Sequence, residues 1–167
     1  MKYKTTMEEL AGSAARVADE LRRLGIVGAI KEMPESTRSA SEAAAAIGCD
    51  VSEIVKSLVF RAAESDDPVL VLAPGSARVD ESKLEAAVGE PVEQATGKFV
   101  RDRTGFAIGG VAPVGHSRPL ATYMDQSLLD HQVVWAAAGT PRSVFPIAPE
   151  DLQRATQAKV ADLAVDA

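Results

Sequence analysis

The feature that most constrains the fold is a pair of apolar segments separated by a short charged turn. Residues 54–62 (IVKSLVFRA) alternate in character, and residues 69–73 (VLVLA) are apolar throughout. Between them, residues 66–68 (DDP) combine acidic side chains with a proline, which is typical of a turn between two strands. The pattern predicts an antiparallel pair of strands, of which the second is fully apolar.

Periodic apolar residues and capping signals predict the remaining elements. Ser39 and Asp80 are expected N-caps of helices that end at Gly48 and Gly89. Further helices are expected at 11–24 and 149–157, a short basic helix or turn at 96–103, and strands at 29–33, 91–94, 106–109, 121–124, 132–138 and 144–147. Pro146 favours an edge position for the last strand. These elements predict a single α+β domain over residues 1–167, with a mixed, mostly antiparallel sheet.

Composition and charge narrow the class of protein. Hydrophobic residues make up 46% of the chain, and no apolar run approaches the roughly 20 residues of a membrane span. The first residues carry charges instead of an apolar stretch, so we expect no signal peptide and a cytoplasmic location. Cys49 is the only cysteine, which excludes an internal disulfide and makes a zinc site unexpected. The net charge of −6 argues against a tight nucleic-acid binder, but not against contact with a short end.

Two features suggest a binding pocket. Lys56 stands within an otherwise apolar strand, where burial of its ammonium is unfavourable without a partner. Residues 104–115 (TGFAIGGVAPVG) form a loop of small residues, in which Gly109 and Gly110 let backbone N–H groups approach a ligand. Each feature also has a structural explanation, because the lysine can reach past a strand edge and the glycines can form a bulge. A site for an anionic or carbonyl group requires that the two converge.

Other residues give weaker chemical signals. His116 follows the loop and is a candidate base because histidine titrates near neutrality, although an exposed loop histidine also fits the sequence. His131 is expected to be structural or on the surface. The chain has neither the Gly-x-Ser-x-Gly of a nucleophile elbow nor the Gly-Lys-Ser/Thr of a phosphate-binding loop. The residues themselves therefore mark no nucleophile and no pair of catalytic carboxylates.

The combination of these segments resembles the YbaK family of aminoacyl-tRNA deacylases, relatives of the editing domain of bacterial prolyl-tRNA synthetases. The resemblance extends over about residues 14–164 and rests on residues 54–60, 69–74, 79–84, 104–115 and 159–164. It implies a barrel-like sheet surrounded by helices, with a pocket for the aminoacylated 3′ end of a tRNA. In that pocket it implies a catalytic role for Lys56 and a substrate-lining role for Gly109 and Pro113, with Gly110 and Gly115 as their neighbours on the loop.

The reaction implied by the resemblance is hydrolysis of the ester that joins a wrong amino acid, Cys or Ala, to tRNA(Pro). We expect backbone N–H groups from Gly109 to Val111 to bind the ester carbonyl or a ribose oxygen, and we include His116 among the substrate-binding candidates. A water activated by the substrate's own hydroxyl or thiol fits the absence of a clear general base. No cofactor and no metal are expected. Mischarged tRNA is the implied partner. The sequence leaves open whether prolyl-tRNA synthetase is a second partner and which oligomeric state the protein has.

Two alternatives to this function remain. A non-catalytic module of the same fold could bind tRNA or a synthetase, and a hydrolase could act on small esters unrelated to tRNA. The net negative charge of the chain is compatible with both alternatives. The identity of the amino acid is also open, because the cysteine-specific subgroup carries an acidic residue after a late glycine turn. Here the residues that follow Gly139 are TPRSVF, without an acid.

Overall fold

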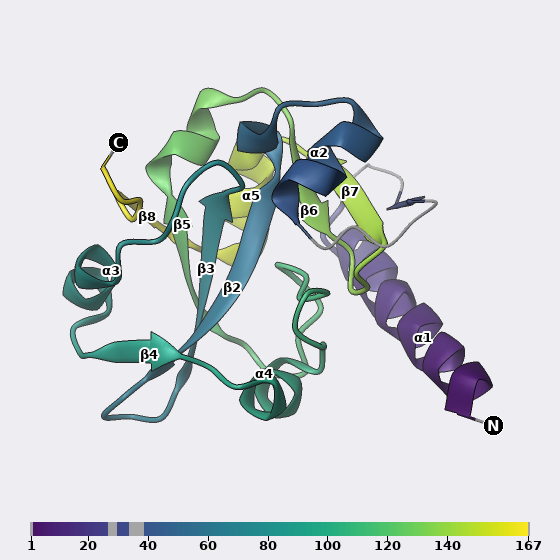
Figure 1. Ribbon diagram of the computed structural model, residues 1–167, viewed down its shortest axis with the longest axis horizontal. Coiled ribbons are helices and arrows are strands. Elements are labelled where there is room, and N and C mark those ends of the chain that lie inside the picture. The colour runs from purple at the N-terminus through teal and green to yellow at the C-terminus, as the bar shows by residue number, and fades with distance from the viewer. Residues whose placement is uncertain (1, 27–29, 34–38, 167) are drawn as a thin grey trace.

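The strands of this protein form two sheets with helices on both sides of the larger one (Figure 1). A computed structural model describes residues 2–26, 30–33 and 39–166. The five-stranded sheet has the order β4-β2-β3-β5-β8, and the three-stranded sheet has the order β1-β7-β6. The strands are β1 (Lys31–Glu32), β2 (Val55–Ala62), β3 (Pro68–Pro74), β4 (Val92–Gln94), β5 (Ala121–Asp125), β6 (Val134–Ala137), β7 (Ser143–Ile147) and β8 (Lys159–Ala161).

The helices follow the capping signals in the sequence. They are α1 (Lys2–Arg23), α2 (Ala40–Ile47), α3 (Glu81–Val88), α4 (Gly97–Thr104) and α5 (Pro149–Thr156), with short 3₁₀ turns at Val51–Glu53 and Gln126–Asp130. Ser39 and Asp80 accept backbone N–H groups of the first turns of α2 and α3, and Gly48 and Gly89 end these helices, as predicted. None of the helices in the described ranges combines the length and the apolar character needed to cross a membrane.

The predicted antiparallel pair is β2 and β3, with Ser57 opposite Leu72. β3 lies at the centre of its sheet, where it also pairs in parallel with β5. Its side chains alternate between two cores. Leu70 and Leu72 face a core that includes residues of α1 and α5, whereas Val69 and Val71 face a second core that includes Leu84 of α3. The α+β class is thus confirmed, with a mixed sheet that is open at β4 and β8 and not closed into a barrel.

The smaller sheet corrects the expectation for Pro146. β7 is the central strand of this sheet, between β1 and β6, and not an edge strand. However, β1 pairs only with Ser143 and Val144, so Pro146 lies beyond the reach of β1 and its missing N–H costs no ladder bond there. A bridge between Ile54 and Trp135 connects the two sheets. Residue 29 of the first predicted strand lies outside the described residues.

The expectation of a strand at 106–109 is wrong. Residues 105–120 contain no strand, because Phe106 is inserted into the core and the chain turns directly after it. The N–H of Gly110 donates to the carbonyl of Ala107 at 3.0 Å, which closes a turn, and Gly109 has a φ of +89° that favours glycine. We call residues 105–116 the glycine loop. Its apolar residues anchor it to the core without a partner strand.

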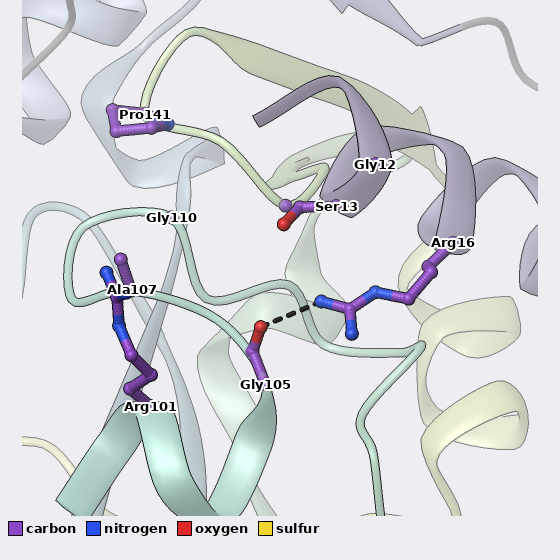
Figure 2. Close-up of a pocket in the computed structure, with 9 residues that line it drawn as sticks. Gly12, Ser13, Arg16, Arg101, Gly105, Ala107, Gly110 and Pro141 are labelled. Carbon is purple, nitrogen blue, oxygen red and sulfur yellow. Dashed lines mark hydrogen bonds between the residues drawn. The ribbon is translucent and has the colours of Figure 1, made fainter. Parts of the chain in front are cut away.

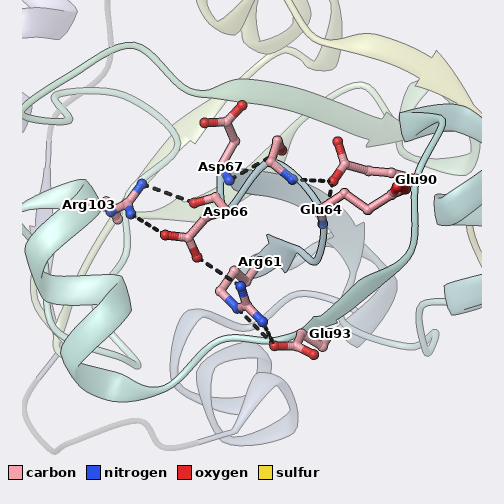
Figure 3. Close-up of polar contacts among 8 residues, drawn as sticks. Arg61, Glu64, Asp66, Asp67, Glu90, Glu93 and Arg103 are labelled. Atoms are coloured by element: carbon pink, nitrogen blue, oxygen red, sulfur yellow. Dashed lines mark hydrogen bonds and ion pairs between the residues drawn. The ribbon is translucent and has the colours of Figure 1, made fainter.

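An ion-pair network holds the far end of the β2–β3 hairpin (Figure 3). Arg61 of β2 pairs with Asp66 in the turn and with Glu93 of β4, and Arg103 of α4 also pairs with Asp66. Asp66 has a φ of +63°, a conformation that a short acidic side chain tolerates better than most. The network therefore links the turn to β4 and α4, at the opposite end of β2 from Lys56.

Candidate functional site

A cavity of about 500 Å³ brings Lys56 and the glycine loop together. Its walls come from α2, the beginning of β2, the strands β6 and β7, and the glycine loop. Lys56, Gly109 and Val111 all line it, although the lysine and the loop are some fifty residues apart in the chain. The two features that the sequence analysis singled out therefore contribute to one cavity, which we call the lysine cavity.

Lys56 lies where β2 has an open edge. Of the two edges of β2, one pairs with β3 and the other with β4. Because β4 pairs only with residues 60–62 of β2, none of the described strands forms ladder hydrogen bonds with the second edge beside Lys56. Its Nζ donates to the carbonyl of Ala77 at 2.5 Å, in the loop between β3 and α3. Burial lowers the pKa of Lys56, and the nearby charge of Arg78 lowers this pKa further. An ammonium has three donors, so the contact with Ala77 leaves capacity for a ligand.

The amides of the glycine loop differ in their availability. The N–H of Gly110 is used within the loop, whereas those of Gly109 and Val111 have no acceptor among the described residues. Gly110 also sets the position of the loop, because a Cβ there would lie 3.1 Å from the Cα of Thr140. The loop thus packs directly on the 139–141 segment and presents two of the three expected amides near the lysine cavity.

Hydroxyl groups in the lysine cavity were missed by sequence reasoning. The Oγ of Ser57 is buried and has no hydrogen-bond partner among the described residues. Thr140 and Ser143 are also buried, and their hydroxyl oxygens are 2.6 Å apart. One signal in the sequence could have identified Ser57. Its hydroxyl shares a strand face with the apolar Val55 and Val59, and a buried hydroxyl without a partner is unfavourable, so a ligand is a candidate partner for it. Ser57 and Lys56 are consecutive residues of β2, so their side chains leave the strand on opposite faces, and both residues line the cavity.

Pro113, Gly115 and His116 lie elsewhere. They line a separate cavity of about 770 Å³ together with residues of α1 and α5. The Nε2 of His116 lies 2.7 Å from the carbonyl oxygen of Ala112, and its ring packs edge-on against Phe106 with centroids 5.8 Å apart. Burial lowers the pKa of His116. The structure therefore places this histidine as a packed part of the loop, away from the lysine cavity.

The lysine cavity combines one positive charge with small residues and larger apolar ones such as Trp135 and Leu58. None of the described residues that line it carries a carboxylate or an imidazole. No group of three or more His, Cys, Asp or Glu side chains suited to a metal ion occurs in the described part of the chain. The arrangement can orient a ligand and stabilise negative charge through Lys56 and backbone donors, but it offers no obvious proton acceptor of its own.

A second, smaller cavity lies beside the glycine loop (Figure 2). Its volume is about 390 Å³, and its lining includes Arg16 of α1 and Arg101 of α4. Gly109 lines the lysine cavity and Gly110 the second one, while Pro141 lines both. We call this the arginine cavity.

Comparisons with known proteins identify the family. Residues 34–155 match the model of the aminoacyl-tRNA editing domain. "Uncharacterized protein YwhH" of Bacillus subtilis is 34% identical over 78% of this chain and 83% of its own length. The "Putative Cys-tRNA(Pro)/Cys-tRNA(Cys) deacylase EbsC" of Enterococcus faecalis is 28% identical over 77% of this chain and 79% of its own length.

A solved structure supports the same relationship. A crystal structure described as "a putative trans-editing enzyme for prolyl tRNA synthetase" is 48% identical, with a TM-score of 0.87 over 92% of this chain and 98% of that chain. The fold, the lysine strand with its glycine loop, and the matched segment agree with the resemblance noted in the sequence. The chain belongs to the YbaK-like family of the aminoacyl-tRNA editing domain.

Proposed function

We propose that this protein hydrolyses the ester of a mischarged aminoacyl-tRNA, with the aminoacylated end bound in the lysine cavity. The observation that carries the proposal is that Lys56, Gly109 and Val111 line one cavity of about 500 Å³. Such a volume is in the range of sites that enclose small ligands. Support also comes from the family and from relatives whose names refer to deacylation or to trans-editing.

The backbone amides would stabilise the transition state. Attack of water on the ester carbonyl places negative charge on its oxygen, and the N–H groups of Gly109 and Val111 are unoccupied donors in the described structure. Loss of one such donor in a preorganised site typically costs about 3–4 kcal/mol of transition-state stabilisation. Because the backbone provides these donors, the position of the loop matters more than the identity of its side chains.

Lys56 would orient the ester. Its ammonium already has a fixed direction through the contact with Ala77, and an additional ligand oxygen can take another of its protons. Positioning of a reactive ester and a water can contribute several kcal/mol to a rate enhancement. With no carboxylate or imidazole among the described lining residues, deprotonation of the water falls to the substrate's own hydroxyl, amine or thiol.

A small amino acid suits the lining of the lysine cavity. Much of the wall consists of short side chains, among them Ala40, Ala43, Ser57, Ala137 and Ser143. A synthetase discriminates poorly against an amino acid that is merely smaller than its own, so a second site for the small error is useful. Cys and Ala on tRNA(Pro) are the proposed substrates, and cysteine is favoured by the name of the Enterococcus relative. Such an enzyme would act in the cytoplasm, where translation takes place.

The test is a deacylation assay with purified protein on Cys-tRNA(Pro), Ala-tRNA(Pro) and Pro-tRNA(Pro). We expect rapid loss of a small mischarged amino acid and little loss of proline. Release of none of the three, with tRNA binding retained, would leave the non-catalytic module as the function. Hydrolysis of simple amino-acid esters at the same rate as of tRNA esters would indicate a general esterase.

A further inference from the structure

We infer that the arginine cavity binds a phosphodiester of the single-stranded end of the substrate RNA. The inference rests on the proposed function and extends it, since it assigns a subsite outside the lysine cavity. Arg16 comes from α1 and Arg101 from α4, and both line a cavity of about 390 Å³ beside the glycine loop. Figure 2 shows Arg16 directed at Gly105 and Arg101 rising from α4 toward the loop.

Arg16 is held in place without a carboxylate. Its Nη2 donates to the carbonyl of Gly105 at 2.7 Å, and its guanidinium carbon lies 4.9 Å from the centre of the Phe106 ring. Gly105 permits this approach, because a Cβ there would be 3.1 Å from Nη1 of Arg16. A guanidinium fixed through one N–H keeps other donors for an anion, and its planar fork matches phosphate oxygens.

Neither of the two arginines at this cavity has an acidic partner among the described residues. Five other arginines pair with carboxylates: Arg22, Arg23, Arg61, Arg103 and Arg154. Arg78 and Arg118 resemble Arg16 and Arg101 in having no ion pair among the described residues, but neither of them lines this cavity. None of the described residues that line the arginine cavity is acidic. In a chain with a net charge of −6, two exposed arginines without acidic partners at one cavity create a local positive potential that suits an anionic ligand.

The position of the cavity fits one continuous substrate. Consecutive residues of the glycine loop, Gly109 and Gly110, line the lysine cavity and the arginine cavity, and Pro141 lines both. An RNA 3′ end with its ester in the lysine cavity would carry its nearest phosphodiesters past this shared wall. Phosphate contacts set register and orientation, without reading sequence. This assignment leaves Lys56 free to act on the ester itself.

The main test compares Arg101→Ala with the wild type on two substrates. With aminoacyl-tRNA we expect KM to rise about tenfold at an almost unchanged kcat, because a charge-assisted contact is lost. With an aminoacyl-adenosine that has no phosphate, the two proteins should be equally active. Arg118→Ala is the matched control, since Arg118 is an exposed arginine outside both cavities. An equal rise of KM for Arg118→Ala, or equal losses on both substrates, would overturn the inference.

A binding experiment separates this inference from the proposed function. We would titrate the trinucleotide CCA at several salt concentrations and expect Arg101→Ala to reduce the slope of log affinity against log salt by about 0.7, the value for one contact to a single strand. This result would support the subsite even if no ester were hydrolysed. Arg16→Lys, which keeps the charge but loses the fork, should weaken binding less than Arg16→Ala. Unchanged binding in all variants, or displacement of the trinucleotide by inorganic phosphate at micromolar concentration, would overturn it.

Discussion

Lys56 and Ala77 are joined by a hydrogen bond that holds the ammonium of the lysine at the loop between β3 and α3. The donor is Nζ and the acceptor is the carbonyl oxygen of Ala77, at 2.5 Å. Ala77 lies in a turn that directly follows β3, where its own N–H donates to the carbonyl of Pro74. The backbone of the turn after β3 therefore positions the charge.

Lys56→Ala should abolish deacylation and leave the fold intact. We expect kcat/KM to fall at least a hundredfold, while the free energy of unfolding changes by about 1 kcal/mol or less, because the lysine is only half-buried. Lys83→Ala is the control: Lys83 lies on α3 and pairs with Asp162 and Asp166, away from the cavity. Turnover by Lys56→Ala comparable to that of Lys83→Ala would refute the role.

Gly110→Ala should displace the glycine loop and impair both stability and activity. The added methyl would lie 3.1 Å and 3.2 Å from backbone atoms of Thr140, which cannot move aside as a flexible side chain can. We expect a destabilisation of about 1–3 kcal/mol in chemical denaturation and a marked loss of kcat/KM. Gly97→Ala is a suitable comparison, because its methyl would meet only the side chain of Ile108 at 3.8 Å. Equal stability of both variants would contradict the proposed packing.

Local signals in the sequence predicted the local elements well. Ser39 and Asp80 cap helices because their side chains accept hydrogen bonds from N–H groups in the first turn. The turn at 66–68 likewise lies directly between the two strands that it connects. In each case the residues that determine the structure are close to it in the sequence. The parallel pairing of β3 with β5 was not predicted, because it joins segments that no short pattern links.

The candidate site could be predicted only in part for the same reason. Lys56 and Gly109 stood out by residue type, but the wall they share depends on long-range packing. Phe106 was interpreted as part of a strand because its apolar surroundings resemble one, whereas its ring fills the core beside Arg16 and His116. In the loop that follows, Gly109 and Val111 line the lysine cavity, whereas residues 113–116 line a different one.

The partly buried His116 should make stability depend on pH. Burial lowers its pKa in the folded state, so the unfolded chain binds a proton first as the pH falls. The free energy of unfolding should therefore have its full value above about pH 6.5 and decrease as the pH falls below this value. His116→Gln should flatten this dependence in urea titrations between pH 7 and pH 5, and His131→Gln, at the chain's other histidine, should retain it.

The activity of the same variant gives a separate prediction. His116 lines a cavity other than that of Lys56, so His116→Gln should change kcat/KM only a few-fold. A loss as large as that of Lys56→Ala would assign the histidine a direct part in the reaction. The measurement is the rate of deacylation at pH 7.5, where we expect both the wild type and the variant to be fully folded.

Ser57→Ala should separate stability from activity. The hydroxyl of Ser57 is buried without a partner among the described residues, so its removal loses no hydrogen bond and relieves a desolvation cost. We expect the melting temperature to stay constant or rise, while kcat/KM falls about tenfold, as for one lost hydrogen bond to the substrate. Ser143→Ala provides the contrast, because its hydroxyl contacts Thr140 and its loss should lower stability. Unchanged kcat/KM in Ser57→Ala would show that this hydroxyl does not contact the substrate.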